Sequence, residues 1–432
     1  EKGGEVRTFC DVLLAPEHIH TFTPSRFHTF TLSHLIALFS DLLVIELASV
    51  LAGPSVGQFF AELGATVIKV ENPRTRGDVT RRWRAPDQTG DVQDDRSAYF
   101  CCCNHGKQSV AVDLTLEDGQ AVVHRLVERA DVVLSSYRPG AATRLGMDTS
   151  TLCALNDRLI VGQITGYGEN DPRAGYDAVI QAESGFTYMN GPPDGEPTKL
   201  PVALMDVLAA HQLKEGLLVK LIERMQTGRG DVVSVSLLQA AVSALVNQAT
   251  NYLVAAHIPE RMGSAHPNIA PYGTLYPTAD GERIVLAVGT DRQFQALCHR
   301  LGLDGMPDDA RFATNADRVE HRDSLDAALR SALSNVKAQE ILAELQDANV
   351  PAGRVRSMPQ VFQQDPAEAM TLRPDGHPAG LRQMAFPGVD EGRPLSPPPR
   401  YGEHTRSILQ DRLDMSNREI TDLVQRGVVD AA

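Results

Sequence analysis

A strand–helix–strand pattern near the start of the chain constrains its fold most. Residues 41–73 read DLLVIELASVLAGPSVGQFFAELGATVIKVENP. The apolar run LLVIEL is typical of a strand that is buried on both faces. Pro54 lies near the start of the helix expected next, and Gly64 lies just past its end, as helix termini prefer. A second apolar run, ATVIKVE, completes a βαβ unit, which predicts a parallel sheet with right-handed crossovers.

The same pattern repeats along the first half of the chain. Further strands are expected at QSVAVDL, DVVLSSY and LIVGQITGYG, and a helix is expected at LEDGQAVVHRLVERA. These segments predict a fold of the α/β class, with a doubly wound, Rossmann-like parallel sheet in a large domain.

The pattern changes after this domain, and 432 residues are enough for two or three domains. A hairpin with Asp280-Gly281 at its turn, followed by helices, predicts a smaller α+β domain. In chain order we expect an N-terminal extension outside the fold (1–40), the large α/β domain (41–225), a connecting helix (226–260), the small α+β domain (261–375) and a segment that returns to the large domain (376–432).

The turn after the first strand argues against a dinucleotide site. A Rossmann phosphate loop needs G-x-G-x-x-G, whose glycines let the backbone approach a pyrophosphate. This chain has ASVLAGPSVG instead, with the bulky pair Val50-Leu51 in the tight part of the turn. We therefore expect neither NAD nor FAD.

Composition argues against several other classes of protein. The net charge of −14 disfavours a nucleic-acid-binding protein, which would show a basic patch. No apolar run in the sequence approaches the roughly 18 residues that cross a membrane. The six cysteines form no C-x-x-C pair, so we expect no metal site and a reducing, cytoplasmic environment.

One carboxylate interrupts an apolar stretch in the middle of the chain. Asp206 lies in PVALMDVLAAH, just before apolar residues that recur every four positions and predict a helix up to Gly228. Such an Asp is typical of a helix N-cap, whose side chain accepts a backbone hydrogen bond. A helix N-terminus also favours an ionised carboxylate, which could be a nucleophile. The residues alone favour the cap and leave the nucleophile open.

Several phrases together resemble the class III coenzyme A transferases, the CaiB/BaiF type. They are VLAGPSVGQFFAELGATVIKVENP, GDVTRRW, DVVLSSYRPGAATRLGM, ITGYGENDPRAGYDAVIQAESGF, PVALMDVLAAH, MQTGRGDVVSVSL, NVPAGRVRSMPQVF and YGEHT, in the family's order over 41–410. The phrases RAGYDAV and AHPNIAPYGTLYPTADG look closest to the succinyl-CoA:glutarate type. The resemblance implies an interlocked homodimer and an enzyme that moves CoA between carboxylic acids.

In that family an aspartate at the position of Asp206 is the nucleophile. The resemblance therefore implies a covalent aspartyl-CoA thioester on Asp206. A carboxylate suits this chemistry because it resembles the substrate acids, so the exchange steps are close to balanced in energy. Tyr176 and Asp177, in GYDAVIQAESG, are expected beside it. Asp177 either hydrogen-bonds the intermediate or orients the loop, and a structural Asx turn is an equal alternative.

The resemblance also implies a path for the adenine, phosphates and pantetheine of CoA. The implied contacts are Val50, Leu51, Ala52, Asn72, Arg74, Val112, Asp113, Leu114, Ser136, Tyr137, Arg138, Ala141 and Arg144. Asn72 stands where formyl-CoA transferase has a basic residue, and Arg74 is a candidate phosphate contact nearby. RPGAATR supplies a Pro-Gly turn before a helix and two guanidinium groups, which suit phosphate. Solvated surface arginines are the alternative.

We expect the CoA thioester as a substrate, with no permanently bound cofactor. The resemblance implies a succinyl-CoA-like donor and a small carboxylic acid as acceptor. Arg261, His266 and Tyr272 could hold a distal carboxylate or be structural. Two alternatives stay open: an α-methylacyl-CoA racemase-type enzyme of the same fold, and a non-catalytic acyl-CoA-binding protein.

Overall fold

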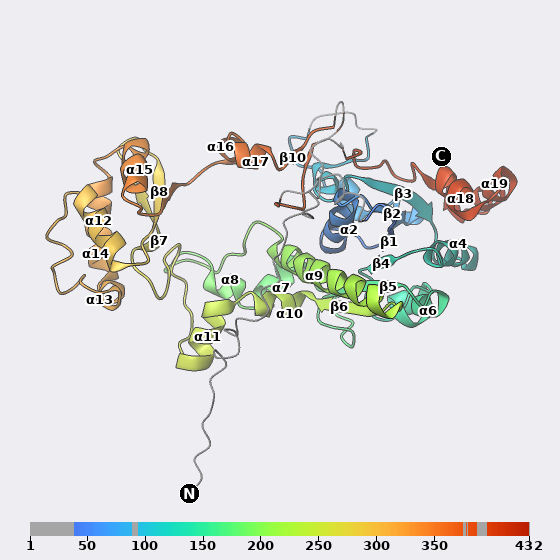
Figure 1. The fold of residues 1–432 in the computed structure, drawn as a ribbon, viewed down its shortest axis with the longest axis horizontal. Helices are drawn as coiled ribbons and strands as arrows, with labels where there is room; N and C mark the ends of the chain where they lie inside the picture. Colours follow the sequence, from blue (N-terminus) through green and yellow to red (C-terminus); the bar gives the residue numbers. More distant parts are fainter. Residues whose placement is uncertain (1–38, 89–93, 375–376, 378, 387–394, 432) are drawn as a thin grey trace, which may run out of the picture.

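The computed structural model describes residues 39–431 apart from 89–93, 375–376, 378 and 387–394. Nearly all of the expected N-terminal extension, residues 1–38, lies outside the described residues. The described chain forms a large domain around a parallel sheet and a smaller domain beside it, joined by two connections (Figure 1).

The large domain is built around a sheet with the strand order β12-β3-β2-β1-β4-β5-β6. The strands are β1 (Leu43–Leu47), β2 (Thr66–Glu71), β3 (Lys107–Val112), β4 (Val132–Ser135), β5 (Ile160–Thr165), β6 (Val232–Ser236) and β12 (Val429–Asp430). Strands β1 to β6 run parallel, and β12 pairs antiparallel with β3. The chain starts at the middle of the sheet and extends it in both directions, so the doubly wound prediction is confirmed.

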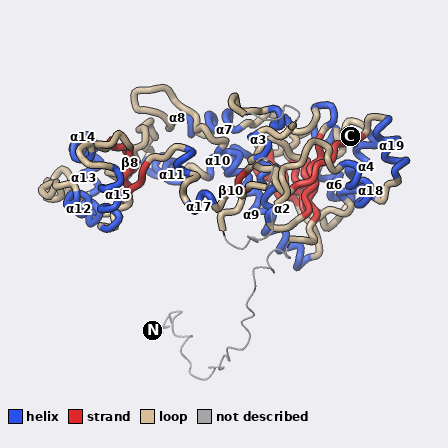
Figure 2. Tube along the Cα trace, turned by 90° about the horizontal axis from the view of Figure 1, so that it is seen from above, coloured by secondary structure: helices blue, strands red, loops and turns tan. Residues whose placement is uncertain are grey.

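Helices cover both faces of this sheet, which is why its strands are mostly apolar and their few charged side chains are buried. In β1, Leu43 and Ile45 belong to one core cluster, whereas Val44 belongs to the other. The first face is covered by α4 (Glu117–Val127), α6 (Thr149–Leu155), α18 (Thr405–Leu413) and α19 (Asn417–Gln425). The second face is covered by α2 (Ala52–Glu62), α9 (Leu204–Thr227) and α10 (Leu237–Ser243). Figure 2 shows the sheet between the two layers.

The small domain has a core of its own. Its antiparallel sheet has the order β7 (Tyr272–Pro277), β8 (Arg283–Ala287) and β9 (Ala352–Arg354). It packs with α12 (Asp291–Arg300), α13 (Asn315–Glu320), α14 (Arg322–Leu333) and α15 (Ala338–Asp347). The expected turn between β7 and β8 contains Gly281 at a φ of 77°. This arrangement confirms the α+β class.

The segment 226–260 differs from the connecting helix that we expected. It contains β6, α10 and α11 (Val246–Ala255). The β-branched run VVSVS pairs with β5, and Ser236 then caps α10 by accepting a hydrogen bond from the N–H of Gln239. The segment therefore completes the sheet of the large domain before the chain leaves it.

Short elements fill the loops and the second connection. Near the carboxyl edge of the sheet these are η1 (Pro73–Thr75), η2 (Val79–Arg82), α3 (Ala98–Cys101), α5 (Ala141–Arg144), α7 (Asp177–Glu183) and α8 (Phe186–Met189). The second connection contains α16 (Met358–Val361), α17 (Asp365–Glu368), β10 (Thr371–Leu372) and β11 (Gly380–Leu381). Strand β12 then brings the end of the described chain beside β3.

Candidate active site

Two neighbouring cavities lie at the carboxyl edge of the parallel sheet. The strand order reverses between β1 and β4, and open α/β sheets bind ligands at such a point. A cavity of about 530 Å³, here called the Asp206 cavity, is lined by residues that follow β1, β4, β5 and β6. A cavity of about 320 Å³, the Lys69 cavity, is lined mainly by residues of β1, β2 and β3 and the loops that follow them. Both are lined by Ser49 and Tyr137, so they form one extended site.

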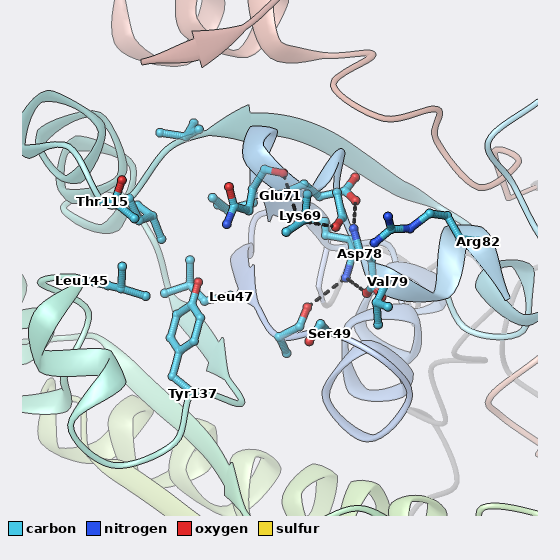
Figure 3. A pocket seen from close by; sticks show the side chains of 17 residues that line it. Leu47, Ser49, Lys69, Glu71, Asp78, Val79, Arg82, Thr115, Tyr137 and Leu145 are labelled. Atoms are coloured by element: carbon cyan, nitrogen blue, oxygen red, sulfur yellow. Dashed lines mark hydrogen bonds and ion pairs between the residues drawn. The ribbon is translucent and has the colours of Figure 1, made fainter. Parts of the chain in front are cut away.

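Most residues implied by the family resemblance line these cavities. Those in the wall of the Asp206 cavity are Val50, Leu51, Ala52, Ser136, Tyr137, Arg138, Ala141, Tyr176 and Asp206. Those in the wall of the Lys69 cavity are Asn72, Val112, Leu114 and Tyr137. Figure 3 shows Tyr137 on one side of the Lys69 cavity and Asp78 and Arg82 on the other. The fold therefore brings together residues from the loops after β1, β2, β3, β4 and β5, and from α9.

Four implied residues do not line either cavity. Arg74 donates through Nε to Asp113 Oδ2 at 2.6 Å, and the Arg74 side chain is 60% exposed. Burial opposes the ionisation of Asp113, but hydrogen bonds from Thr115 and Arg74 lower its pKa overall. Arg144 ends α5 as an exposed side chain. The fourth residue, Asp177, contacts the start of α9 instead.

Asp206 is the third residue of α9, so the N-cap prediction was wrong. The N-cap is Ala203, because the helix begins three residues earlier than the apolar periodicity indicates. No described residue donates a hydrogen bond to the Asp206 carboxylate. Burial, and then the nearby charge of Asp177, raise the pKa of Asp206 to about 7. Burial thus outweighs the helix dipole, which we expected to favour the ionised form.

Asp177 and Gln181 hold the start of α9 in place. Asp177 Oδ1 accepts the backbone N–H of Met205 at 2.9 Å, and its Oδ2 accepts Gln181 Nε2 at 2.8 Å. The buried Gln181 also accepts the N–H of Leu200 at 2.7 Å and donates to the carbonyl of Val202 at 3.2 Å. Of the alternatives for Asp177, this geometry matches the orienting role.

Sequence reasoning missed a tyrosine near the carboxylate. Burial, and then the charge of Asp206, raise the pKa of Tyr99 to about 12, so its hydroxyl stays protonated. Its ring packs edge-on against Trp83 with centroids 5.1 Å apart. No local pattern marks Tyr99, because 107 positions separate it from Asp206 and only the fold brings them together.

Two arginines were also missed, although both occur in phrases that match the family. Arg82, in GDVTRRW, lines the Lys69 cavity. Arg173, in RAGYDAV, lines the Asp206 cavity, stacks 3.7 Å from the centroid of Tyr167 and lies 2.8 Å from Asp171. In the sequence alone they do not differ from surface charges.

The residues considered for a distal carboxylate lie elsewhere in this chain. The rings of His266 and Tyr272 pack edge to face with centroids 5.1 Å apart, and Arg261 donates to the carbonyl of Tyr188 at 3.4 Å. None of the three lines the Asp206 or the Lys69 cavity. These contacts fit the alternative in which the three residues have a structural role.

The described part of the chain contains neither a cluster of metal ligands nor a membrane-spanning helix. Within it, no three His, Cys, Asp or Glu side chains gather as ligands for a metal ion. None of its helices combines the length and the apolar character needed to cross a bilayer.

The fold and the site define an α/β enzyme with a half-buried carboxylate in the wall of an elongated ligand site. Residues 39–405 match the model of CoA-transferase family III. The chain therefore belongs to this family and is a CoA-transferase.

Known proteins of the family resemble the chain over most of its length. It is 38% identical to the succinate–glutarate CoA-transferase of Agrobacterium fabrum, over 86% of this chain and 95% of that protein. It is 32% identical to the succinyl-CoA:glutarate CoA-transferase of Mus musculus, over 90% of this chain and 89% of that protein. A CaiB/BaiF family protein from Brucella suis has a crystal structure with a TM-score of 0.74 and 39% identity, over 86% of this chain and 98% of that one.

Proposed function

We propose that the enzyme moves CoA from a succinyl-CoA-like donor to a carboxylic acid acceptor through a thioester on Asp206. The observation that supports this most is the position of Asp206. It is a carboxylate without a hydrogen-bond partner among the described residues, in the wall of a cavity that adjoins a second one. If the acyl group lies near Asp206, the rest of CoA can occupy the Lys69 cavity and its rim.

The chemistry follows from the need to keep the acyl group activated. The Asp206 carboxylate attacks the thioester carbonyl, which forms a mixed anhydride and releases the CoA thiolate. The thiolate attacks the aspartyl carbonyl, which releases the donor acid and leaves CoA on Asp206. The acceptor carboxylate reverses these steps: it forms a new anhydride, and the thiolate then attacks the acceptor's carbonyl. No proton is gained or lost overall.

The state of the Asp206 carboxyl suits a nucleophile. With a pKa of about 7, a large share of the enzyme is ionised at neutral pH. Removal from water also makes the anion more reactive, because its hydration shell need not be lost during attack. Burial therefore costs some ionisation and increases reactivity.

The expected substrates are dicarboxylic acids and their CoA monothioesters. Support comes from the names of two relatives, which act on succinate or succinyl-CoA and glutarate. In the site, Arg138 supplies positive charge to the Asp206 cavity, whereas Arg173 also lines it but is paired with Asp171. A cavity of about 530 Å³ has room for such an acyl group.

We also propose a cytoplasmic homodimer. The helix α11 and the segment after it expose several large apolar side chains, namely Val246, Tyr252, Leu253, Val254 and Ile258. Contiguous exposed apolar surface marks a protein interface, and a second copy would cover it. The described cysteines are free thiols, which fits a reducing compartment.

A substrate panel tests the proposed function. The enzyme is mixed with succinyl-CoA and, in separate reactions, with glutarate, other dicarboxylates, oxalate and monocarboxylates. Mass spectrometry should show a new acyl-CoA with at least one dicarboxylate, formed in equal amount to the succinate released. If CoA compounds bind but no acid ever accepts CoA, the acyl-CoA-binding alternative replaces this proposal.

A further inference from the structure

The loop between β1 and α2 has an unusual backbone at Val50. This residue lines the Asp206 cavity and has a φ of 73°. A β-branched residue rarely adopts this left-handed region, because its side chain crowds the backbone. Such strain persists only where neighbouring structure imposes it. The neighbours of Val50 must therefore hold the loop.

Asp78 and Cys103 hold the two polar backbone groups of Val50. The Val50 N–H donates to Asp78 Oδ2 at 3.2 Å, and Cys103 Sγ donates to the Val50 carbonyl at 3.6 Å. Asp78 is itself buried and accepts hydrogen bonds from the N–H and hydroxyl of Thr80 at 3.0 and 2.8 Å. The carboxylate that binds the Val50 N–H is thus fixed in position.

Lys69 links this carboxylate to the end of β1. Its Nζ lies 2.9 Å from Asp78 Oδ2 and 2.9 Å from Glu46 Oε1, and it donates to the carbonyl of Ala48 at 2.9 Å. Only 1% of the Lys69 side chain is exposed. The buried Lys69 ammonium therefore contacts both Asp78, which binds the Val50 N–H, and Ala48, which lies two residues before Val50. Figure 3 shows Lys69, Asp78 and Ser49 together at the wall of the Lys69 cavity.

Lys107 holds the other end of the loop. Its Nζ lies 2.7 Å from Glu46 Oε2 and donates to the carbonyl of Pro54, in the first turn of α2, at 2.8 Å. The two lysines balance Glu46 and Asp78 in charge, as buried ions require. One buried network therefore contacts the loop before, at and after Val50.

We propose that Lys69 and Asp78 are positioning residues of the transfer reaction, which hold loop 49–51 in its strained conformation beside Asp206. This inference rests on the proposed function. Buried ion pairs add little stability compared with apolar packing, and their better-attested value is to select one conformation. A misplacement of about 1 Å can slow a reaction roughly 100-fold, so a rigid loop should affect the rate of attack more than the affinity for CoA.

Two substitutions at Val50 separate the backbone from the side chain. Val50→Gly and Val50→Ala both shorten the side chain in the cavity wall, but only glycine is unstrained at a φ of 73°. We expect Val50→Gly to form the CoA adduct on Asp206 roughly tenfold more slowly than Val50→Ala, because its loop is less rigid. The Tm of Val50→Gly should equal or exceed that of Val50→Ala. Rapid quenching followed by mass spectrometry of the Asp206 peptide measures the rate.

Substitutions at Asp78 test the network itself. Asp78→Asn keeps an acceptor for the Val50 N–H but loses the charge opposite Lys69, whereas Asp78→Ala loses both. The adduct rate should fall from wild type to Asp78→Asn to Asp78→Ala, while the Kd for CoA changes much less. Asp148→Ala is the control for lost stability, since it removes only a helix cap in the same domain. It should lower Tm and leave the adduct rate unchanged.

Each outcome is decisive. Equal adduct rates for Val50→Gly and Val50→Ala would overturn the positioning role, whatever the Asp78 variants show. If Asp78→Ala does not fold, the Val50 pair decides alone. If the wild-type enzyme forms no adduct on Asp206, the proposed function fails and the inference fails with it. If the wild-type enzyme forms the adduct and the two Val50 variants form it at equal rates, only the inference is rejected.

Discussion

Asp177 accepts a hydrogen bond from the backbone N–H of Met205 at 2.9 Å. The contact joins the start of α7 to the first turn of α9, one residue before Asp206. Asp177 therefore supplies the carboxylate acceptor at the N-terminus of α9, a role that the sequence pattern suggests for Asp206. Asp206 can therefore face the cavity, while the charge of Asp177 helps to raise its pKa.

Asp206→Asn should stop transfer without weakening the fold. Loss of the nucleophile should reduce kcat by more than roughly 10³-fold. No cap is lost, because Asp206 is not the N-cap. The pKa of Asp206 in the folded enzyme lies above the ordinary 3.8, so this carboxyl ionises more readily in the unfolded chain. The stability of the wild-type enzyme therefore falls as the pH rises from about 4 through about 7. The variant avoids this loss.

Thermal unfolding checks the stability part of that prediction. The Tm of Asp206→Asn should exceed that of wild type at about pH 8, and the difference should shrink towards about pH 4. A lower Tm for the variant at about pH 8 would mean that the side chain stabilises the helix after all. Mass spectrometry must first exclude deamidation to Asp, which would restore activity.

Transfer should depend on pH through the same carboxyl. Attack requires the ionised form, so kcat/KM should fall as the pH drops through about 7. Asp177→Asn should move the midpoint to lower pH, because it removes the like charge but keeps an oxygen for the Met205 N–H. Steady-state rates across the pH range measure both midpoints. A midpoint that does not move in the variant would exclude Asp177 as a cause of the shift.

Gly57→Ala should destabilise the enzyme although alanine favours helices. A Cβ at Gly57, inside α2, would lie 1.9 Å from Glu46 Oε2. Alanine normally gains about 1 kcal/mol over glycine within a helix. Here it must displace a carboxylate that is bound by two buried lysines, so we expect a net loss of at least ~1 kcal/mol. Gly305→Ala is the control, since nothing lies within 4 Å of its Cβ. A gain in Tm for Gly57→Ala would show that the network yields easily.

The enzyme should not exchange α-protons of acyl-CoA substrates. Racemisation needs an acid and a base on opposite faces of the α-carbon. The described lining of the Asp206 cavity includes Tyr176 but no histidine to pair with Asp206. A 2-methylacyl-CoA recovered from deuterated water should carry no deuterium at its α-position. Rapid incorporation without transfer to any acid would favour the racemase-type alternative.

The sequence predicted the sheet well because its signals are local. The largely apolar runs of β1 and β2 favour burial on both faces, and Gly64 marks the end of α2. Parallel strands then place their following loops at one edge, so Val50, Ser136 and Asp206 could be expected close together. The family resemblance assigned a role to Asp206 that the apolar pattern alone did not favour.

The remaining features depend on contacts between distant segments. The N-cap of α9 was misjudged because its first turn is held from outside, by Asp177. Tyr99 and the Lys69 network have no signature in the sequence, since charged or aromatic residues within strands and loops do not reveal their partners. The pKa of Asp206 likewise depends on burial, which only the packed structure defines.

An oxygen-labelling experiment tests the aspartyl-thioester mechanism most directly. When the acceptor carboxylate attacks the thioester on Asp206 and CoA thiolate then takes the acyl group, one acceptor oxygen remains on the aspartate. Turnover with an ¹⁸O-labelled dicarboxylate and succinyl-CoA should therefore place ¹⁸O in the peptide that contains Asp206, and in no other peptide. Transfer of CoA to the labelled acid with no ¹⁸O in that peptide would contradict the covalent mechanism.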